Sequence, residues 1–179
     1  MLVITSEYST GTIRSTLLAV PTRLPMLAAK SVVLAALIFV ATEAIAIASF
    51  FLGVAILHAK VPVSLGDPGV LRVILGMGLY LTMLGLFSMA IGGLFRNTVA
   101  GITGVIAFVM VLPVLSQLLP GSLVKHVHVY LPTEAGRLVG QAHQGSGDLL
   151  SPWQGFGVFC LWTALFLAFG AFALRRRNA

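Results

Sequence analysis

The chain has 179 residues, of which 58% are hydrophobic and 9% are charged, and its mean hydropathy is +1.03. Soluble domains carry about 25% charged residues, and a domain of this length would leave much of its surface in water. The composition therefore excludes a soluble globular enzyme. The net charge of +6 comes without a basic stripe and interleaved aromatic residues, so it does not indicate nucleic-acid binding.

The first predicted element is an amphipathic segment at residues 5–30. Its apolar residues recur at spacings of three and four, the period of one helix face: Ile13, Leu17, Val20, Leu24 and Leu27. The other face is mostly hydroxyl-bearing, which suits contact with a protein better than contact with anionic lipid. Pro21 and Pro25 each remove a helix hydrogen bond, so we expect an elbow before the membrane. A passive interfacial helix that only anchors the chain is the alternative.

Four apolar runs follow, and each is long enough for the roughly 20 helical residues that a hydrocarbon core requires. They cover residues 31–57, 70–95, 98–119 and 153–174. None alternates apolar and polar residues as a barrel strand does, and lipid leaves the helix as the remaining structure. The predicted fold is an all-α integral membrane protein, with a cytoplasmic segment at 1–30 and a transmembrane domain at 31–179.

The connections between the runs have different lengths. Arg96 and Asn97 form a very short link, so the second and third helices are expected to be antiparallel neighbours. The loop before the second run ends in the turn cluster Gly66-Asp67-Pro68-Gly69. The loop at 120–152 is long and rich in glycine, and its moderately apolar middle, residues 126–139, could form a short interfacial helix.

The basic residues predict the orientation, because cytoplasmic loops carry an excess of Lys and Arg. With both termini inside, the cytoplasmic side holds seven: Arg14, Arg23, Lys30, Arg96, Arg175, Arg176 and Arg177. The outer side then holds four: Lys60, Arg72, Lys125 and Arg137. We therefore expect cytoplasmic N- and C-termini and an external loop at 120–152.

Glu43 is the only ionisable residue deep in a predicted span. Such residues are costly in lipid and usually face a protein interior or a water path. Glu43 could form a site for a cationic substrate, a proton relay or a polar contact between helices. It could equally make a structural hydrogen bond with a nearby hydroxyl such as Thr42 or Ser49.

Two further features of the spans concern the backbone. Small residues that let helices approach closely are concentrated in the second run: Gly76, Gly78, Gly85, Gly92 and Gly93. Pro113 lies in the third run and predicts a bend there, either static or acting as a hinge.

His126 and His128 form a His-x-His pair, and His58 and His143 lie on the same predicted side. Glu134 could complete a metal site with them, but no cysteine or tight spacing supports one, so we predict no metal. Serine, histidine and acidic residues also occur in the 120–152 loop. Because no Gly-x-Ser-x-Gly elbow accompanies them, a membrane hydrolase is a weak alternative.

Several short motifs occur one after another along the chain. Residues 4–17 read Ile-Thr-Ser-Glu-Tyr-Ser-Thr-Gly-Thr-Ile-Arg-Ser-Thr-Leu, and Pro21, Arg23 and Ala29-Lys30 follow. The later motifs are Ser49-Phe50-Phe51-Leu52-Gly53, Gly92-Gly93-Leu94-Phe95-Arg96-Asn97-Thr98, Leu112-Pro113, Tyr130-Leu131-Pro132, Leu150-Ser151-Pro152-Trp153 and Arg175-Arg176-Arg177. Together they resemble bacterial ATP-binding-cassette (ABC) type-2 permeases, most closely the actinobacterial members, over nearly the whole chain.

The resemblance implies a permease of six membrane helices that works as a dimer with a separate ATPase. The coupling helix would dock that ATPase through Glu7, Tyr8, Gly11, Thr12, Ile13 and Arg14, and the elbow of Pro21, Arg23 and Pro25 would transmit the movement. The first two spans of the family are missing here, and Met1–Thr5 would be the end of the second. We therefore expect a fragment, a mis-assigned start or a degenerate copy.

The predicted function is the permease subunit of an ABC transporter, an exporter, in a bacterial plasma membrane. The chain has no Gly-x-x-x-x-Gly-Lys-Ser/Thr loop, so ATP and Mg²⁺ are expected on the partner ATPase and no cofactor on this chain. A second permease protomer, identical or different, and membrane lipid are the other expected partners. The alternatives are a non-transporting membrane scaffold or truncated permease copy, and a small membrane enzyme that uses His126, His128 or Glu134.

Overall fold

The computed structural model describes residues 23–57, 64–95, 98–118, 127–142 and 149–176, and every regular element in these residues is helical. The elements are α3 (Arg23–Leu57), α4 (Val70–Phe95), α5 (Thr98–Ile106), η1 (Ala107–Val111), α6 (Leu112–Ser116), α8 (Pro132–Arg137), η2 (Leu138–Gly140) and α9 (Pro152–Arg176). Four stretches are long and apolar enough to cross a membrane: Ala28–Ile56, Val70–Phe95, Thr98–Ser116 and Pro152–Phe172. They confirm the predicted all-α fold with four helices of membrane-spanning length and composition.

α3 is one continuous helix of 35 residues that begins at Arg23. Pro25 lies in its first turn, where backbone N–H groups have no partner within the helix, so the missing N–H of proline is tolerated there. Arg23 and Pro25 are therefore part of α3. The predicted amphipathic helix lies for the most part in residues 1–22, outside the described residues.

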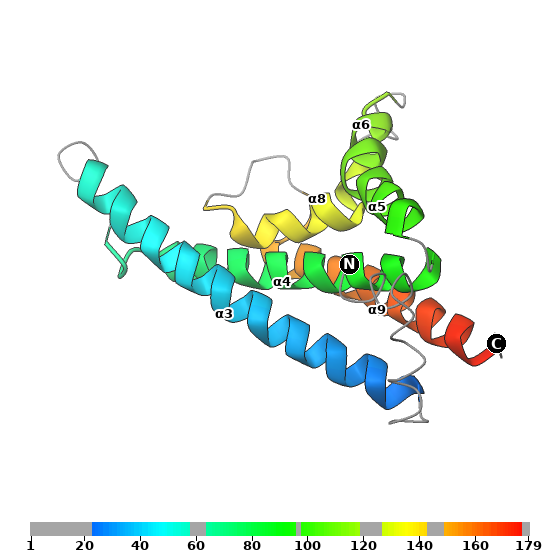
Figure 1. Cartoon of the computed structure of the whole chain (residues 1–179). Coiled ribbons are helices and arrows are strands. Elements are labelled where there is room, and N and C mark those ends of the chain that lie inside the picture. Colours follow the sequence, from blue (N-terminus) through cyan, green and yellow to red (C-terminus); the bar gives the residue numbers. More distant parts are fainter. Residues whose placement is uncertain (1–22, 58–63, 96–97, 119–126, 143–148, 177–179) are drawn as a thin grey trace.

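α4 is the central helix of the structure. α3, α5, η2 and α9 all pack against it, and Figure 1 shows α3 crossing α4 while α8 runs alongside. The buried core consists of Phe87 and Ile91 on α4 with Phe159 on α9. Phe166 packs edge-on against Phe87 and Phe108, each at a centroid distance of 5.1 Å, so aromatic contacts join α4, η1 and α9.

Glycines on α4 determine where α3 makes contact. A Cβ atom at Gly85 would overlap Ile38, and a Cβ atom at Gly78 would overlap the carboxyl group of Glu43. The close approach that the glycines of this span predicted is therefore found at both positions. The other faces of α3 carry large exposed apolar side chains, among them Leu37, Val40 and Ile45.

The third span is divided into α5, the π-helical turn η1 and α6. The N–H of Leu112 bonds to the carbonyl of Ala107, five residues earlier, which is the π-helical spacing. Pro113 follows directly and has no N–H to continue the α-helical pattern. A π-helical turn therefore directly precedes the segment where Pro113 predicts a bend, and Figure 1 shows this span extending away from α4.

The segment 127–142 folds back against the bundle. Ala135 on α8 and Val139 on η2 are completely buried. The carbonyl of Val139 faces Gly76 on α4, and the carbonyl of Ala135 faces Gly155 on α9. Gly76 lies six residues into α4, which is about 9 Å along the helix axis. α8 and η2 therefore lie beside the first turns of α4 and α9. Part of the predicted interfacial helix at 126–139 is thus a packed element between α4 and α9.

Candidate functional site

The predicted ATPase-docking residues lie outside the part of the chain that the structure describes. This holds for Glu7, Tyr8, Gly11, Thr12, Ile13 and Arg14, and also for Pro21 of the elbow. The docking surface therefore stays a prediction. The polar side chains that the structure does bring together lie at two places, one around α8 and one between α3 and α4.

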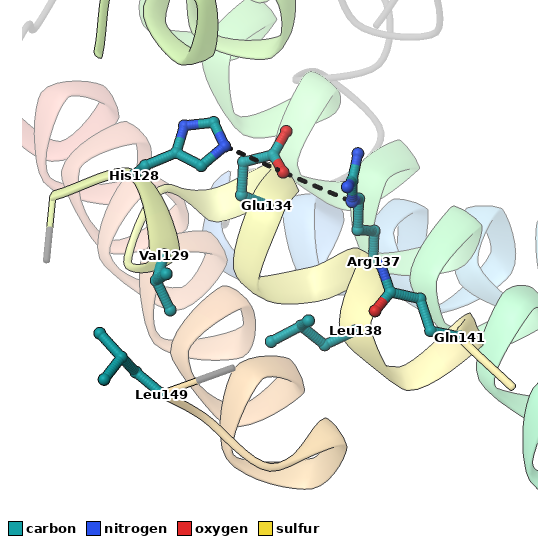
Figure 2. Close-up of a pocket in the computed structure, with 7 residues that line it drawn as sticks. All are labelled: His128, Val129, Glu134, Arg137, Leu138, Gln141 and Leu149. Atoms are coloured by element: carbon teal, nitrogen blue, oxygen red, sulfur yellow. Dashed lines mark ion pairs between the residues drawn. The ribbon is translucent and has the colours of Figure 1, made fainter. Parts of the chain in front are cut away.

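The first polar cluster is centred on Glu134, in the first turn of α8. Its Oε2 lies 3.5 Å from His128 Nε2 and 3.4 Å from Arg137 Nε. Figure 2 shows Glu134 between these two side chains. The side chain of Glu134 is 18% exposed and that of Arg137 is 58% exposed, so the second contact is screened by water and contributes little to stability.

A small cavity of about 130 Å³ adjoins this cluster. It is lined by four polar side chains and three apolar ones: His128, Glu134, Arg137, Gln141, Val129, Leu138 and Leu149. A cavity of this size has room for several water molecules, and an ordered water needs two to four polar partners. It is too small for a drug-sized ligand, whose pockets measure about 300–1,000 Å³.

Ser116 joins the end of the third span to this cluster. Its Oγ lies 2.7 Å from the carbonyl of Pro113 and 2.7 Å from His128 Nδ1. A carbonyl can only accept, so the hydroxyl donates its one hydrogen to Pro113 and accepts from Nδ1–H of His128. The Nε2 atom then faces the carboxyl group of Glu134, an attractive contact when a proton lies between them.

Ser116, His128 and Glu134 have the residue types of a hydrolase triad but not its arrangement. Ser116 is only 5% exposed and does not line the cavity, and its hydrogen is committed to Pro113. A triad serine must face the substrate and pass its proton to the histidine, so this geometry favours a structural link. His58, His126 and His143 lie outside the described residues, within which no three metal-ligating side chains are grouped.

Two further contacts hold the 127–142 segment in place. Arg72, in the first turn of α4, donates from Nη2 to the carbonyl oxygens of Gln141 and Ala142 at 3.0 and 3.2 Å. The indole Nε1 of Trp162 donates to the carbonyl of Tyr130 at 3.0 Å. The sequence does not mark Arg72, Trp162 or Ser116 as site residues, because none of them belongs to a local motif and Arg72 bears only on the topology.

The second location with a buried polar side chain is the contact between α3 and α4 at Glu43. The residue is 9% exposed, and its Oε1 atom has no hydrogen-bond partner among the described residues. Thr42 does not supply one, because its hydroxyl donates within α3 to the carbonyls of Ile38 and Phe39 at 2.8 and 3.1 Å. Ser49 is exposed. The structural hydrogen bond that is one alternative for Glu43 is therefore not formed at Oε1.

Comparisons with known proteins found no relative of this chain. No family model matches it, no curated protein is significantly similar in sequence, and no solved structure matches its fold.

Proposed function

We propose that this chain is a permease subunit of an ABC transporter, driven by a separate ATPase that binds ATP and Mg²⁺. The observation that carries the proposal is the continuity of α3 from Arg23 to Leu57. This helix begins directly after the segment whose motifs resemble a coupling helix. A helix of 35 residues is about 52 Å long, so it is long enough to carry a cytoplasmic displacement through the whole membrane.

The packing of α3 supports the same function. α3 contacts mainly α4, with a small contact to α9, while large apolar side chains cover its remaining faces. The third span is also exposed along one side, at Val99, Ile102 and Ile106. We propose that a second permease protomer faces these two spans, and that substrate passes between the protomers in the direction of export.

A co-purification experiment tests this function. The tagged chain is cross-linked in intact membranes of its native host, extracted in mild detergent, and the co-purifying proteins are identified. We expect a phosphate-loop ATPase with the unchanged chain and its loss with Arg14→Glu. Arg176→Glu is the matched control, because it reverses one basic charge on the same predicted side of the membrane but outside the coupling segment.

The outcomes separate the proposed parts of the function. Recovery of the ATPase at equal yield with Arg14→Glu would overturn the docking role of that residue. If no ATPase is recovered even after cross-linking, the permease function is wrong, and a non-transporting scaffold that tolerates charge reversal at Glu7 and Arg14 becomes the better interpretation.

A further inference from the structure

Glu43 lies near the middle of the span Ala28–Ile56, about 20 Å along the helix axis from either end. Its side chain does not turn toward an end of the helix. It is directed at α4, where the absence of a side chain at Gly78 leaves the space that the carboxyl group fills. Ile38 fills the corresponding space at Gly85. The acid thus takes part in the packing of two helices at the depth where a charge is most costly.

Polar groups close to the carboxyl group are engaged elsewhere. The hydroxyl of Thr82, one turn after Gly78, donates to the carbonyl of Gly78 at 2.7 Å. The hydroxyl of Thr42 donates to carbonyls of its own helix. Among the described residues Oε1 is buried without a partner, so an ionised carboxylate at Glu43 would lack a donor at that oxygen.

Charged and titratable groups on the neighbouring elements do not face Glu43 either. On α4, Arg72 lies six residues before Gly78 and binds carbonyls at the end of η2. Tyr80 lies two residues after Gly78, about 200° around the helix, and packs on Phe159 of α9. α9 contributes Cys160, on a helix that makes only a small contact with α3. On α3 itself, Lys30 is about 20 Å away along the axis.

We propose that Glu43 is a proton-binding site inside the membrane, at which the neutral acid holds α3 against α4 and loss of the proton releases that contact. The neutral acid can fill the space at Gly78 without a counter-charge, whereas the carboxylate needs water or a cation. Because the side chain itself fills the space at Gly78, room for water or a cation between the two helices there requires them to move apart. The ligand is therefore a proton and not a metal cation, which would need several further oxygen ligands.

Infrared spectroscopy of the full chain in lipid nanodiscs tests the protonation directly. Glu43→Gln has nearly the same shape and cannot ionise, so the other acids cancel in the difference spectrum between it and the unchanged chain. We expect a protonated carboxylic-acid carbonyl band at neutral pH that disappears in one step as the pH rises. Asp67→Asn, which removes an exposed acid outside the spans, is the matched control and should leave this band unchanged.

Disulfide cross-linking tests the release of α3. Ser31→Cys and Met89→Cys place thiols at a pair of side chains whose Oγ and Sδ atoms are 4.0 Å apart, in a background of Cys160→Ser. Thiol oxidation itself depends on pH, so each yield is compared with that of the same pair carrying Glu43→Gln. We expect equal yields at neutral pH and a several-fold lower yield with Glu43 once the acid band has disappeared.

The proposal requires both results. Superimposable acid bands with and without Glu43 would overturn it, and so would equal cross-linking yields at every pH. A carboxylate band at neutral pH that shifts between sodium and potassium buffers would also overturn it, because Glu43 would then bind a metal cation. Neither measurement involves an ATPase or a transported substrate, so the outcome is independent of the proposed transport function.

Discussion

Two glycines on α9, two residues apart, allow a direct test of how α8 is held. A Cβ atom at Gly155 would overlap the carbonyl oxygen of Ala135 and lie 2.8 Å from Leu138 Cδ1. A Cβ atom at Gly157 would have nothing within 4 Å. We expect Gly155→Ala to displace α8 and to lower the free energy of unfolding, whereas Gly157→Ala is tolerated.

The magnitude follows from two contributions. Replacing glycine by alanine inside a helix gains about 1 kcal/mol from helix propensity, and this gain is common to both variants. Forcing an extra methyl group into a packed site costs about 1–3 kcal/mol, and a carbonyl of the backbone cannot move aside as a flexible side chain can. Gly155→Ala should therefore unfold with a free energy about 1–3 kcal/mol below that of Gly157→Ala.

The assay is reversible unfolding in mixed detergent micelles, followed by circular dichroism and by tryptophan fluorescence. Trp162 is a suitable reporter, because its indole N–H bonds to the carbonyl of Tyr130 in the segment that α8 anchors. The reasoning is refuted if the two alanine variants are equally stable, or if Gly155→Ala is the more stable one. Either result would mean that α8 does not pack against Gly155.

Two further predictions concern the packing around α4. Phe87 is fully buried and makes ring contacts with Phe108, Phe159 and Phe166, each worth about 0.5–1.5 kcal/mol, so Phe87→Ala should cost about 2–4 kcal/mol in the same unfolding assay. Phe51→Ala, at a ring that is 54% exposed, is the control, and equal costs would contradict the core assignment. Arg72→Met removes the donor to two carbonyls at the end of η2, and we expect amide hydrogen exchange in residues 138–142 to rise about tenfold or more, since a charged hydrogen bond is worth about 1.5–3 kcal/mol. Unchanged exchange would show that the glycine contacts alone hold this segment.

The number and approximate position of the spans could be predicted because they depend on local properties of the chain. Apolar run length relative to bilayer thickness is enough to place α4 and α9. The predicted span at 31–57 is close to the observed stretch Ala28–Ile56. The helix α3 begins earlier, at Arg23, and includes Pro25, because the first helical turn tolerates proline. The missing N–H of Pro113 predicts a local interruption of the helical hydrogen bonds, but it does not predict the π-helical turn at Ala107–Val111.

The tertiary structure alone decided which faces meet. A helix that is apolar on all sides has no periodic pattern from which a packing face can be read, so the sequence of α3 does not show that Glu43 faces Gly78. Ser116 and His128 lie twelve residues apart, in different elements, and no motif relates them. The middle of the 120–152 loop has the same composition whether it lies on a membrane surface or between helices. Its position depends on Gly76 and Gly155, which leave room for backbone carbonyls from a distant part of the chain. The positions of the membrane-spanning helices depend on the apolar solvent around the chain. The positions of the polar sites depend on contacts between residues that are far apart in sequence.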